Sequence, residues 1–149
     1  MKQLWLALGL AAALVPTANA EVWVNPGFYS HHFNKELNLN NNNQGLGVEV
    51  SIDDTYSLTA GVFENSDRAT SRYLGVYVMP YRVGAFKAGV AVGAFNGYPQ
   101  MQDGGWFPAA VPTMALEGER LGFNVSFIPN IGDRVKSALV FHVKFKLVP

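Results

Sequence analysis

Histidine, serine and carboxylate side chains occur at two places in the sequence from which they could reach one another. His31 and His32 end the first strand-like run, and the segment Phe63–Arg68 (FENSDR) ends the third, with Ser66 at its centre. In an up-and-down arrangement of strands both places lie at the same end of the sheet. A hydroxyl beside an imidazole is the pair of groups that acyl transfer uses. Serine, aspartate and arginine are also common in surface loops, so the residues alone leave both interpretations open.

The same histidines are not expected to bind a metal. Adjacent residues of a strand face opposite sides, so at most one of His31 and His32 points into a given site, and the sequence does not say which. The chain has three histidines and no cysteine, and no His-x-His spacing occurs. We therefore expect neither a metal nor a cofactor. The lack of cysteine also excludes disulfides and thiolate chemistry.

Eight strand-like segments are expected to position these residues. Apolar and polar residues alternate with a period of two, and no stretch has the period of a helix. The segments are Val22–Phe33, Gln44–Ile52, Tyr56–Glu64, Ser71–Tyr81, Ala85–Phe95, Phe107–Glu117, Leu121–Ile128 and Val135–Leu147. Short connections alternate with longer ones along the chain, which is typical of a meander. The sequence predicts an all-β fold, an eight-stranded antiparallel up-and-down transmembrane β-barrel.

The fraction of charged residues indicates whether lipid or water surrounds the outside of this barrel. Only 15% of the residues are charged, against about 25% in ordinary soluble domains. The last strand has Leu139, Phe141, Val143, Phe145 and Leu147 on one face, and we expect that face to contact lipid and the face with His142 and Lys144 to lie inside. A soluble periplasmic lipid-binding barrel remains the alternative. With 11 basic and 11 acidic residues the chain has no electrostatic reason to bind nucleic acid.

Residues 1–20 are typical of a secretory signal peptide. Lys2 precedes an apolar stretch from Leu4 to Val15, and Ala18–Ala20 (ANA) fits a small-x-small cleavage site. The remaining residues, 21–149, are predicted to form one outer-membrane β-barrel domain, and the protein is expected to be located in the cell outer membrane as a monomer.

Three further features carry expectations. Pro108 and Pro112 cannot donate to a sheet ladder, so the sixth strand should be locally unpaired, either as a place of lipid entry or as an irregular strand start. Glu49 falls on the inner face, where a buried charge needs a partner, and Lys144 or Lys146 can supply it. The tract Asn38–Asn43 (NLNNNN) is interpreted as a polar loop without a function of its own.

The order of these features resembles the outer-membrane lipid A palmitoyltransferases. The matching pieces are His31–Phe33, Gln44–Glu49, Ala60–Ser66, Gly89–Gly93, Phe107–Pro112 and Phe123–Pro129, which together cover nearly all of the mature chain. The family consists of eight-stranded barrels that move a palmitoyl chain from a phospholipid to lipid A. No single piece is specific, and the resemblance rests on their order and spacing.

The resemblance implies a function and a set of site residues. The catalytic positions fall on His32, or His31, and on Ser66. Lipid would enter sideways near Pro108, Pro112 and Pro129, and the lumen would measure acyl length. Phospholipid and lipid A would be the partners. For such a reaction we expect Arg68, Arg72 and Asp67 to bind the substrate, the two arginines as cationic contacts for lipid phosphates. The alternative for both arginines is ordinary loop charge in contact with water.

The sequence departs from the family in two ways. Asn65 stands where the family has an aspartate before the serine, so the group expected to orient the histidine is missing. The segment Glu21–Trp23 leaves no room for the amphipathic helix that precedes the family's first strand. A non-enzymatic barrel of similar fold, acting in envelope integrity, adhesion or phage exclusion, is therefore the alternative function.

Overall fold

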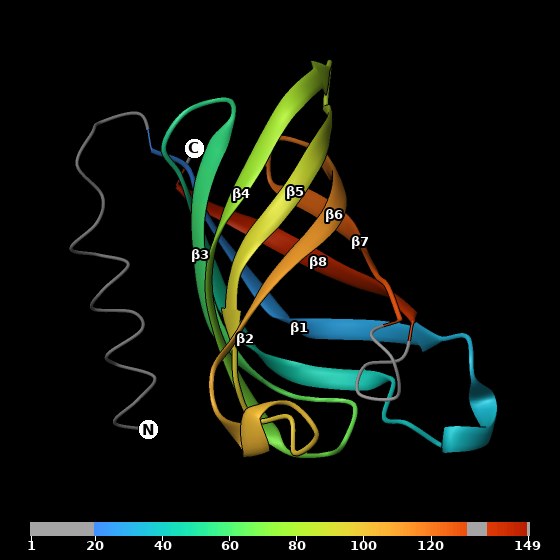
Figure 1. Ribbon diagram of the computed structural model, residues 1–149. Helices are drawn as coiled ribbons and strands as arrows, with labels where there is room; N and C mark the ends of the chain where they lie inside the picture. Colours follow the sequence, from blue (N-terminus) through green and yellow to red (C-terminus); the bar gives the residue numbers. More distant parts are fainter. Residues whose placement is uncertain (1–19, 131–136, 149) are drawn as a thin grey trace.

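The computed structural model describes residues 20–130 and 137–148, which form a closed barrel of eight antiparallel strands (Figure 1). Each strand pairs with its neighbour in the chain, and β1 pairs with β8 to close the barrel. The strands are β1 (Val22–His32), β2 (Asn42–Ser51), β3 (Tyr56–Glu64), β4 (Thr70–Val83), β5 (Phe86–Phe95), β6 (Phe107–Glu117), β7 (Leu121–Ile128) and β8 (Ala138–Val148). The predicted fold class is confirmed.

Two short 3-10 turns were not expected from the sequence. They are η1 (Lys35–Leu37) and η2 (Gln102–Gly104), and both lie in long connections between strands. Among the described residues no helix is long and apolar enough to cross a bilayer, a result that has no bearing on strands. Residues 1–19 of the expected signal peptide and the expected start of the last strand at Val135 fall outside the described residues.

The two ends of the barrel differ in their connections. Residues 52–55, 84–85 and 118–120 form short turns at one end, here called the turn end, where β1 also begins and β8 finishes. The long connections 33–41, 65–69 and 96–106 leave the other end, here called the loop end (Figure 1). His32 finishes β1 at this loop end, and the β3–β4 connection carries Ser66 to the same end.

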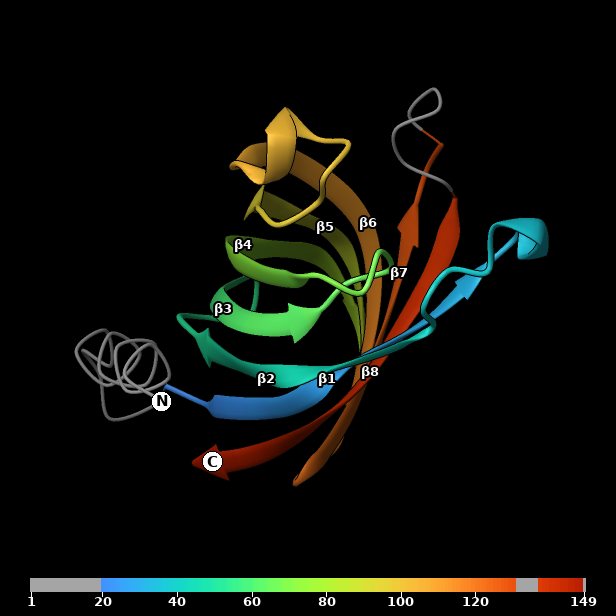
Figure 2. The same cartoon turned by 90° about the horizontal axis from the view of Figure 1, so that it is seen from below.

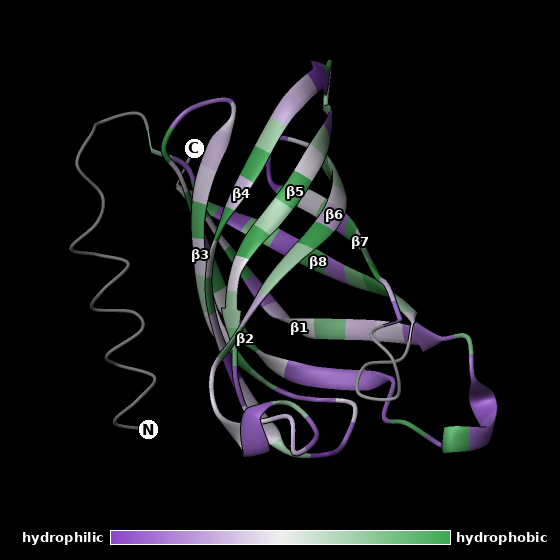
Figure 3. Cartoon of the chain, viewed as in Figure 1, coloured by the Kyte–Doolittle hydropathy of each residue, from purple (hydrophilic) through white to green (hydrophobic). Residues whose placement is uncertain are grey.

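The period of two places the faces of β8 as the sequence predicts. Ala138, His142 and Lys144 are buried, whereas Phe145 and Leu147 are 47% and 59% exposed on the outside. Figure 3 shows the resulting bands of hydrophilic and hydrophobic residues along the strands. Because the outward side chains are apolar, the barrel is inverted relative to a soluble domain, whose charged groups face water.

Buried charges close the lumen near the turn end. Lys144 Nζ lies 2.9 Å from Glu49 Oε2 and 2.7 Å from Glu117 Oε1, and Lys87 Nζ lies 2.9 Å from Glu117 Oε2. Lys144 Nζ is also 4.8 Å from the centre of the Trp23 ring. The expected pairing of Glu49 with Lys144 is therefore present. We call Trp23, Glu49, Lys87, Glu117 and Lys144 the floor cluster.

Glycines on the inner face allow β4 and β5 to approach closely. A Cβ atom at Gly89 would collide with the Val78 carbonyl of β4, and one at Gly93 with the Leu74 carbonyl. Small inward residues suit the narrow lumen of an eight-stranded barrel. The backbone contacts supply the physical reason for those glycines.

The ladder between β6 and β7 covers only half of β6. Their pairing runs from Glu117↔Gly122 to Thr113↔Ser126, whereas β6 pairs with β5 along its whole length. Toward the loop end the two ribbons diverge (Figure 2). Pro112 is the first β6 residue beyond the ladder, and it has no N–H to extend the pairing. We call the region beyond the end of this ladder, bordered by Phe107–Pro112 on one side and by Phe127–Pro129 on the other, the β6–β7 seam. The expectation of a locally unpaired sixth strand is confirmed on the β7 side of β6, whereas pairing on the β5 side is complete.

Candidate functional site

A cavity of about 760 Å³ occupies the loop-end half of the lumen. Its walls come from all eight strands and from the β1–β2, β3–β4 and β5–β6 connections. The floor cluster lies below it at the turn end. This volume falls within the range of roughly 300–1,000 Å³ that is usual for small-molecule sites.

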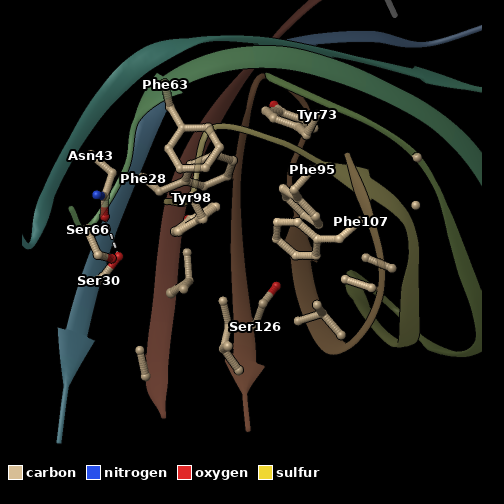
Figure 4. A pocket seen from close by; sticks show the side chains of 18 of the residues that line it. Phe28, Ser30, Asn43, Phe63, Ser66, Tyr73, Phe95, Tyr98, Phe107 and Ser126 are labelled. Atoms are coloured by element: carbon tan, nitrogen blue, oxygen red, sulfur yellow. Dashed lines mark hydrogen bonds between the residues drawn. The ribbon is translucent and has the colours of Figure 1, made fainter. Parts of the chain in front are cut away.

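Aromatic rings line much of the cavity (Figure 4). Neighbouring ring centres are 5.1–6.1 Å apart, a spacing at which edge-to-face and offset arrangements are favourable. The rings belong to Phe28, Phe63, Tyr73, Phe95, Tyr98 and Phe107. Because the lining is largely apolar, a guest gains most by burying hydrocarbon surface there.

His32 and Ser66 meet at the wall of this cavity. His32 Nε2 lies 2.9 Å from Ser66 Oγ, and both residues line the cavity. His32 is buried on the inner face of β1, and Ser66 is half-buried in the β3–β4 connection. The two candidate catalytic residues from the sequence are thus brought into hydrogen-bonding distance.

Asn41 contacts the other nitrogen of the same imidazole. Its Oδ1 atom lies 2.6 Å from His32 Nδ1. An amide oxygen can only accept a hydrogen bond, so Nδ1 carries the proton and donates it. Nε2 of the neutral ring is then free to accept the proton of the Ser66 hydroxyl. The three side chains form a chain of donors and acceptors in the order Ser66, His32, Asn41.

Further asparagines join the β1–β2 connection to the segment that carries Ser66. The Asn40 N–H donates to the Ser66 carbonyl at 2.9 Å, and Asn40 Nδ2 donates to Glu64 Oε1 at 2.9 Å. Asn43 Nδ2 donates to the Glu64 carbonyl at 2.8 Å, and Asn43 Oδ1 accepts from Ser30 Oγ. The sequence predicts a polar loop without a function for the asparagine tract, whereas in the structure the tract helps to hold the site together.

Asn65 has a structural position and does not contact His32. Its side chain is fully buried, with Nδ2 donating to Ser71 Oγ and to the Gly97 carbonyl, both at 2.8 Å. Its Oδ1 accepts from the N–H groups of Asp67 and Ala69. An aspartate could not make the two donated bonds. Asn65 therefore does not occupy the position beside His32 that the resemblance implies for the residue before the serine.

The remaining predicted residues lie around the mouth of the cavity or outside it. His31 faces the outer side of β1, pairs with Leu139 of β8 and does not line the cavity. Asp67 is exposed at the mouth. Arg68 is exposed and donates from both Nη atoms to the Asn38 carbonyl at 3.2 Å. Arg72 is exposed on the outside of β4.

The three predicted prolines lie at the β6–β7 seam. Pro108 and Pro129 line the cavity, and Pro112 faces outward where the ladder between the two strands ends. Each is exposed. The prolines in the sequence therefore indicated where pairing of β6 is interrupted. Only the register shows that the lost pairing is with β7 and not with β5.

Two chemical features complete the site. Burial raises the pKa of the Tyr98 phenol in the β5–β6 connection, with the nearby Asp67 charge as a smaller cause. That phenol stays neutral at physiological pH and adds no charge to the apolar lining. Within the part of the chain that the structure describes, no cluster of three or more histidine, aspartate or glutamate residues could hold a metal ion.

Comparison with known proteins supports the fold and goes no further. One solved structure, described as a de novo design of transmembrane beta-barrels, aligns with a TM-score of 0.55 at 14% sequence identity, over 86% of this chain and 93% of that one. No protein-family model and no curated protein matches the sequence. At so low an identity the likeness is one of fold alone.

Proposed function

We propose that this protein is an outer-membrane acyltransferase that moves a fatty acyl chain from a phospholipid to lipid A. The observation that carries the proposal is the 2.9 Å contact between His32 Nε2 and Ser66 Oγ at the wall of an aromatic-lined cavity. A base–hydroxyl pair facing an apolar cavity is suited to an ester whose acyl chain is buried while its carbonyl stays at the reactive end.

The outer surface supports a position in lipid. Large apolar side chains are exposed on neighbouring strands, and on a soluble protein they would form an unusually large apolar patch. They include Leu74, Met114, Leu116, Leu121, Phe123, Phe127, Phe145 and Leu147. Exposed aromatic residues also occur near both ends, with Tyr29 and Trp106 toward the loop end and Tyr56 and Tyr81 toward the turn end. Such pairs of aromatic girdles are typical of barrels in outer membranes.

The β6–β7 seam gives the acyl chain a lateral route to the cavity. Pro108 and Pro129, which border the seam, also line the cavity. Along the half of β6 from Phe107 to Pro112 no register pairing to β7 occurs among the described residues. A chain arriving from the bilayer can thus reach His32 and Ser66 without passing through the aqueous loops.

Cationic groups near the loop end suit the polar parts of both lipids. Arg68 follows Asp67, which lines the cavity, and Arg72 is exposed on the outside of β4 near the loop end. A guanidinium group pairs well with phosphate. In the proposed reaction His32 is the general base, and a lipid A hydroxyl is the final acceptor of the acyl group.

Mass spectrometry of lipid A tests this proposal. Cells that express the protein should contain lipid A with one added acyl mass, and this species should disappear with His32→Ala and with Ser66→Ala. His31→Ala is the matched control, because His31 faces the other side of the same strand, and it should keep the added mass. An unchanged spectrum for the wild-type barrel under membrane-perturbing conditions would contradict the proposal.

One observation favours the alternative of a non-enzymatic barrel. The group on His32 Nδ1 is the neutral amide of Asn41, and an amide stabilises a protonated imidazole less than a carboxylate does. In that alternative His32 only joins the β1–β2 and β3–β4 connections by hydrogen bonds. The composition of lipid A is then the same with and without the protein.

A further inference from the structure

Three side chains from three separate segments form a hydrogen-bonded series at the cavity wall. Ser66 Oγ lies 2.9 Å from His32 Nε2, and His32 Nδ1 lies 2.6 Å from Asn41 Oδ1. They come from the β3–β4 connection, the end of β1 and the β1–β2 connection. The order is that of a nucleophile, a base and an orienting group, an arrangement in which asparagine can take the third place.

Ser66 differs from the other serines of the cavity in its partner. Ser30 Oγ donates to Asn43 Oδ1, and Ser126 Oγ shares a hydrogen bond of 2.8 Å with Thr113 Oγ1. Neither of those partners can take up a proton at neutral pH. Among the serines that line the described cavity, Ser66 is the one with a hydroxyl placed against an imidazole nitrogen.

The backbone around Ser66 is held in place from the same loop that orients His32. Asn40 holds the Ser66 carbonyl and the Glu64 carboxylate, and Asn43 holds the Glu64 carbonyl. Asn41 lies between these two residues and points its side chain to His32. One short tract therefore positions both partners of the Ser66–His32 contact, which is the preorganisation that a reacting pair needs.

We propose that Ser66 is a nucleophile that carries the acyl group as a covalent ester, and that Asn41 is the positioning residue that keeps His32 in its Nδ1–H form. This inference rests on the proposed acyl transfer and specifies its course. The alternative course is direct transfer, in which Ser66 only orients His32 and the acceptor hydroxyl attacks the donor.

The two half-reactions balance without another reagent. First, Ser66 Oγ attacks the donor's ester carbonyl and gives its proton to His32 Nε2. The bond from that carbonyl to the glycerol oxygen breaks, and His32 returns the proton to the glycerol oxygen, which leaves a lysophospholipid. Second, an acceptor hydroxyl attacks the acyl–serine carbonyl and gives its proton to Nε2. Ser66 Oγ leaves and recovers the proton.

An alkyl fluorophosphonate tests the nucleophile directly. This probe phosphonylates an activated serine with loss of fluoride, so labelling does not depend on knowing the natural lipids. With the folded barrel in detergent micelles, intact mass should show one adduct, and peptide mapping should place it on Ser66 and not on Ser30 or Ser126. The adduct should be absent in Ser66→Ala and in His32→Gln. Heat-modifiable gel migration verifies that each variant is folded.

The role of Asn41 is tested by the rate at which Ser66 is labelled and by the tautomer of the His32 ring. Asn41→Ala should slow labelling by about tenfold or more, which is less than the roughly 10²–10⁴-fold that a general acid–base group itself contributes. Asn41→Asp should restore the rate because a carboxylate also accepts from Nδ1–H. Nitrogen-15 NMR of the His32 ring should show the Nδ1–H tautomer in the wild type and a mixture in Asn41→Ala. A purely structural asparagine would leave the tautomer unchanged in a folded variant.

The outcomes separate this inference from the proposed function. If lipid A gains an acyl chain while Ser66 stays unlabelled in the folded wild type, transfer is direct and the covalent step is wrong. If Ser66 is labelled and lipid A never changes, the nucleophile stands and the lipid A acceptor is wrong. Labelling of Asn41→Ala at the wild-type rate with an unchanged His32 tautomer would overturn the role of Asn41.

Discussion

Ser66 Oγ lies 2.9 Å from His32 Nε2, although 34 positions of the chain separate the two residues. The contact forms because β1 and β3 both finish at the loop end, where the β1–β2 connection holds the Ser66 segment by its backbone. The pair is thus a product of barrel topology and of one asparagine-rich loop.

His32→Gln should remove acyl transfer while leaving the barrel folded. Glutamine keeps a polar side chain at the site but cannot take up a proton, so the rate should fall by about 10²–10⁴-fold, as for loss of a general base. Transfer from a phospholipid is measured in mixed micelles with purified protein. His31→Gln, on the outer face of the same strand, should keep the wild-type rate, and a loss of equal size in both variants would argue against the assignment.

Asn65→Asp should destabilise the barrel without raising activity. The substitution introduces the residue type that the resemblance to the palmitoyltransferases implies, but the buried carboxylate would face Ser71 Oγ and the Gly97 carbonyl with no proton to donate. Loss of hydrogen bonds at a fully buried group costs about 1–3 kcal/mol. Denaturant unfolding in micelles gives the change in stability. Higher transfer activity in this variant would show that Asn65 occupies the orienting position after all.

The Glu49–Lys144 pair should show coupling in a double-mutant cycle. Both side chains are almost fully buried, and removal of one partner of such a pair costs about 3–5 kcal/mol. Lys144→Met should be more damaging than Glu49→Gln, because it removes the cation that lies against the buried Glu49 carboxylate. In Glu49→Gln the Lys144 ammonium keeps its contact with Glu117. The unfolding free energies of both single variants and of the double variant give the coupling. Additive effects would mean that the contact contributes nothing to stability.

Pro112→Val should tighten the β6–β7 seam. Valine supplies an N–H and a β-branched side chain at the first position beyond the ladder, so pairing can continue toward Phe127. Amide exchange of Phe127 and Ile128 should slow, and acyl transfer from bilayer phospholipid should fall. Labelling of Ser66 by a short, water-soluble fluorophosphonate should stay the same, since that probe enters from the loop end. If both reactions slow equally, the seam is not the lipid route.

Ala91→Phe should shorten the acyl chain that the protein accepts. Ala91 lines the cavity and packs against the cluster of Tyr77, Met79 and Ala115, so a ring there fills the deep part of the cavity. Competition between phospholipids of different chain length measures the preference. Ala94→Phe places the same ring outside the cavity on the same strand and should leave the preference unaltered. An unchanged preference in Ala91→Phe would mean that the chain is bound elsewhere.

The local pattern of the chain was enough to predict the strands and their faces. Side chains alternate across any strand, so the period of two in the closing strand already separated Leu139 and Phe145 from His142 and Lys144. The connection lengths likewise predicted an up-and-down barrel with an asymmetric pair of ends. Both signals are local, because neither requires knowledge of which distant residues meet.

Contacts between loops were decided by the tertiary structure. Whether His31 or His32 faces the lumen depends on the bulge in β1 and on its register with β2 and β8. That Asn41 and not Asn65 contacts His32 depends on how the β1–β2 connection folds over the next hairpin. Closure of the barrel brings these segments together, and a sequence pattern carries no information on the shear and register that set such contacts. The amino-acid pattern was therefore enough to predict the barrel and the histidine–serine pair, whereas the position of Asn41 follows only from the folded chain.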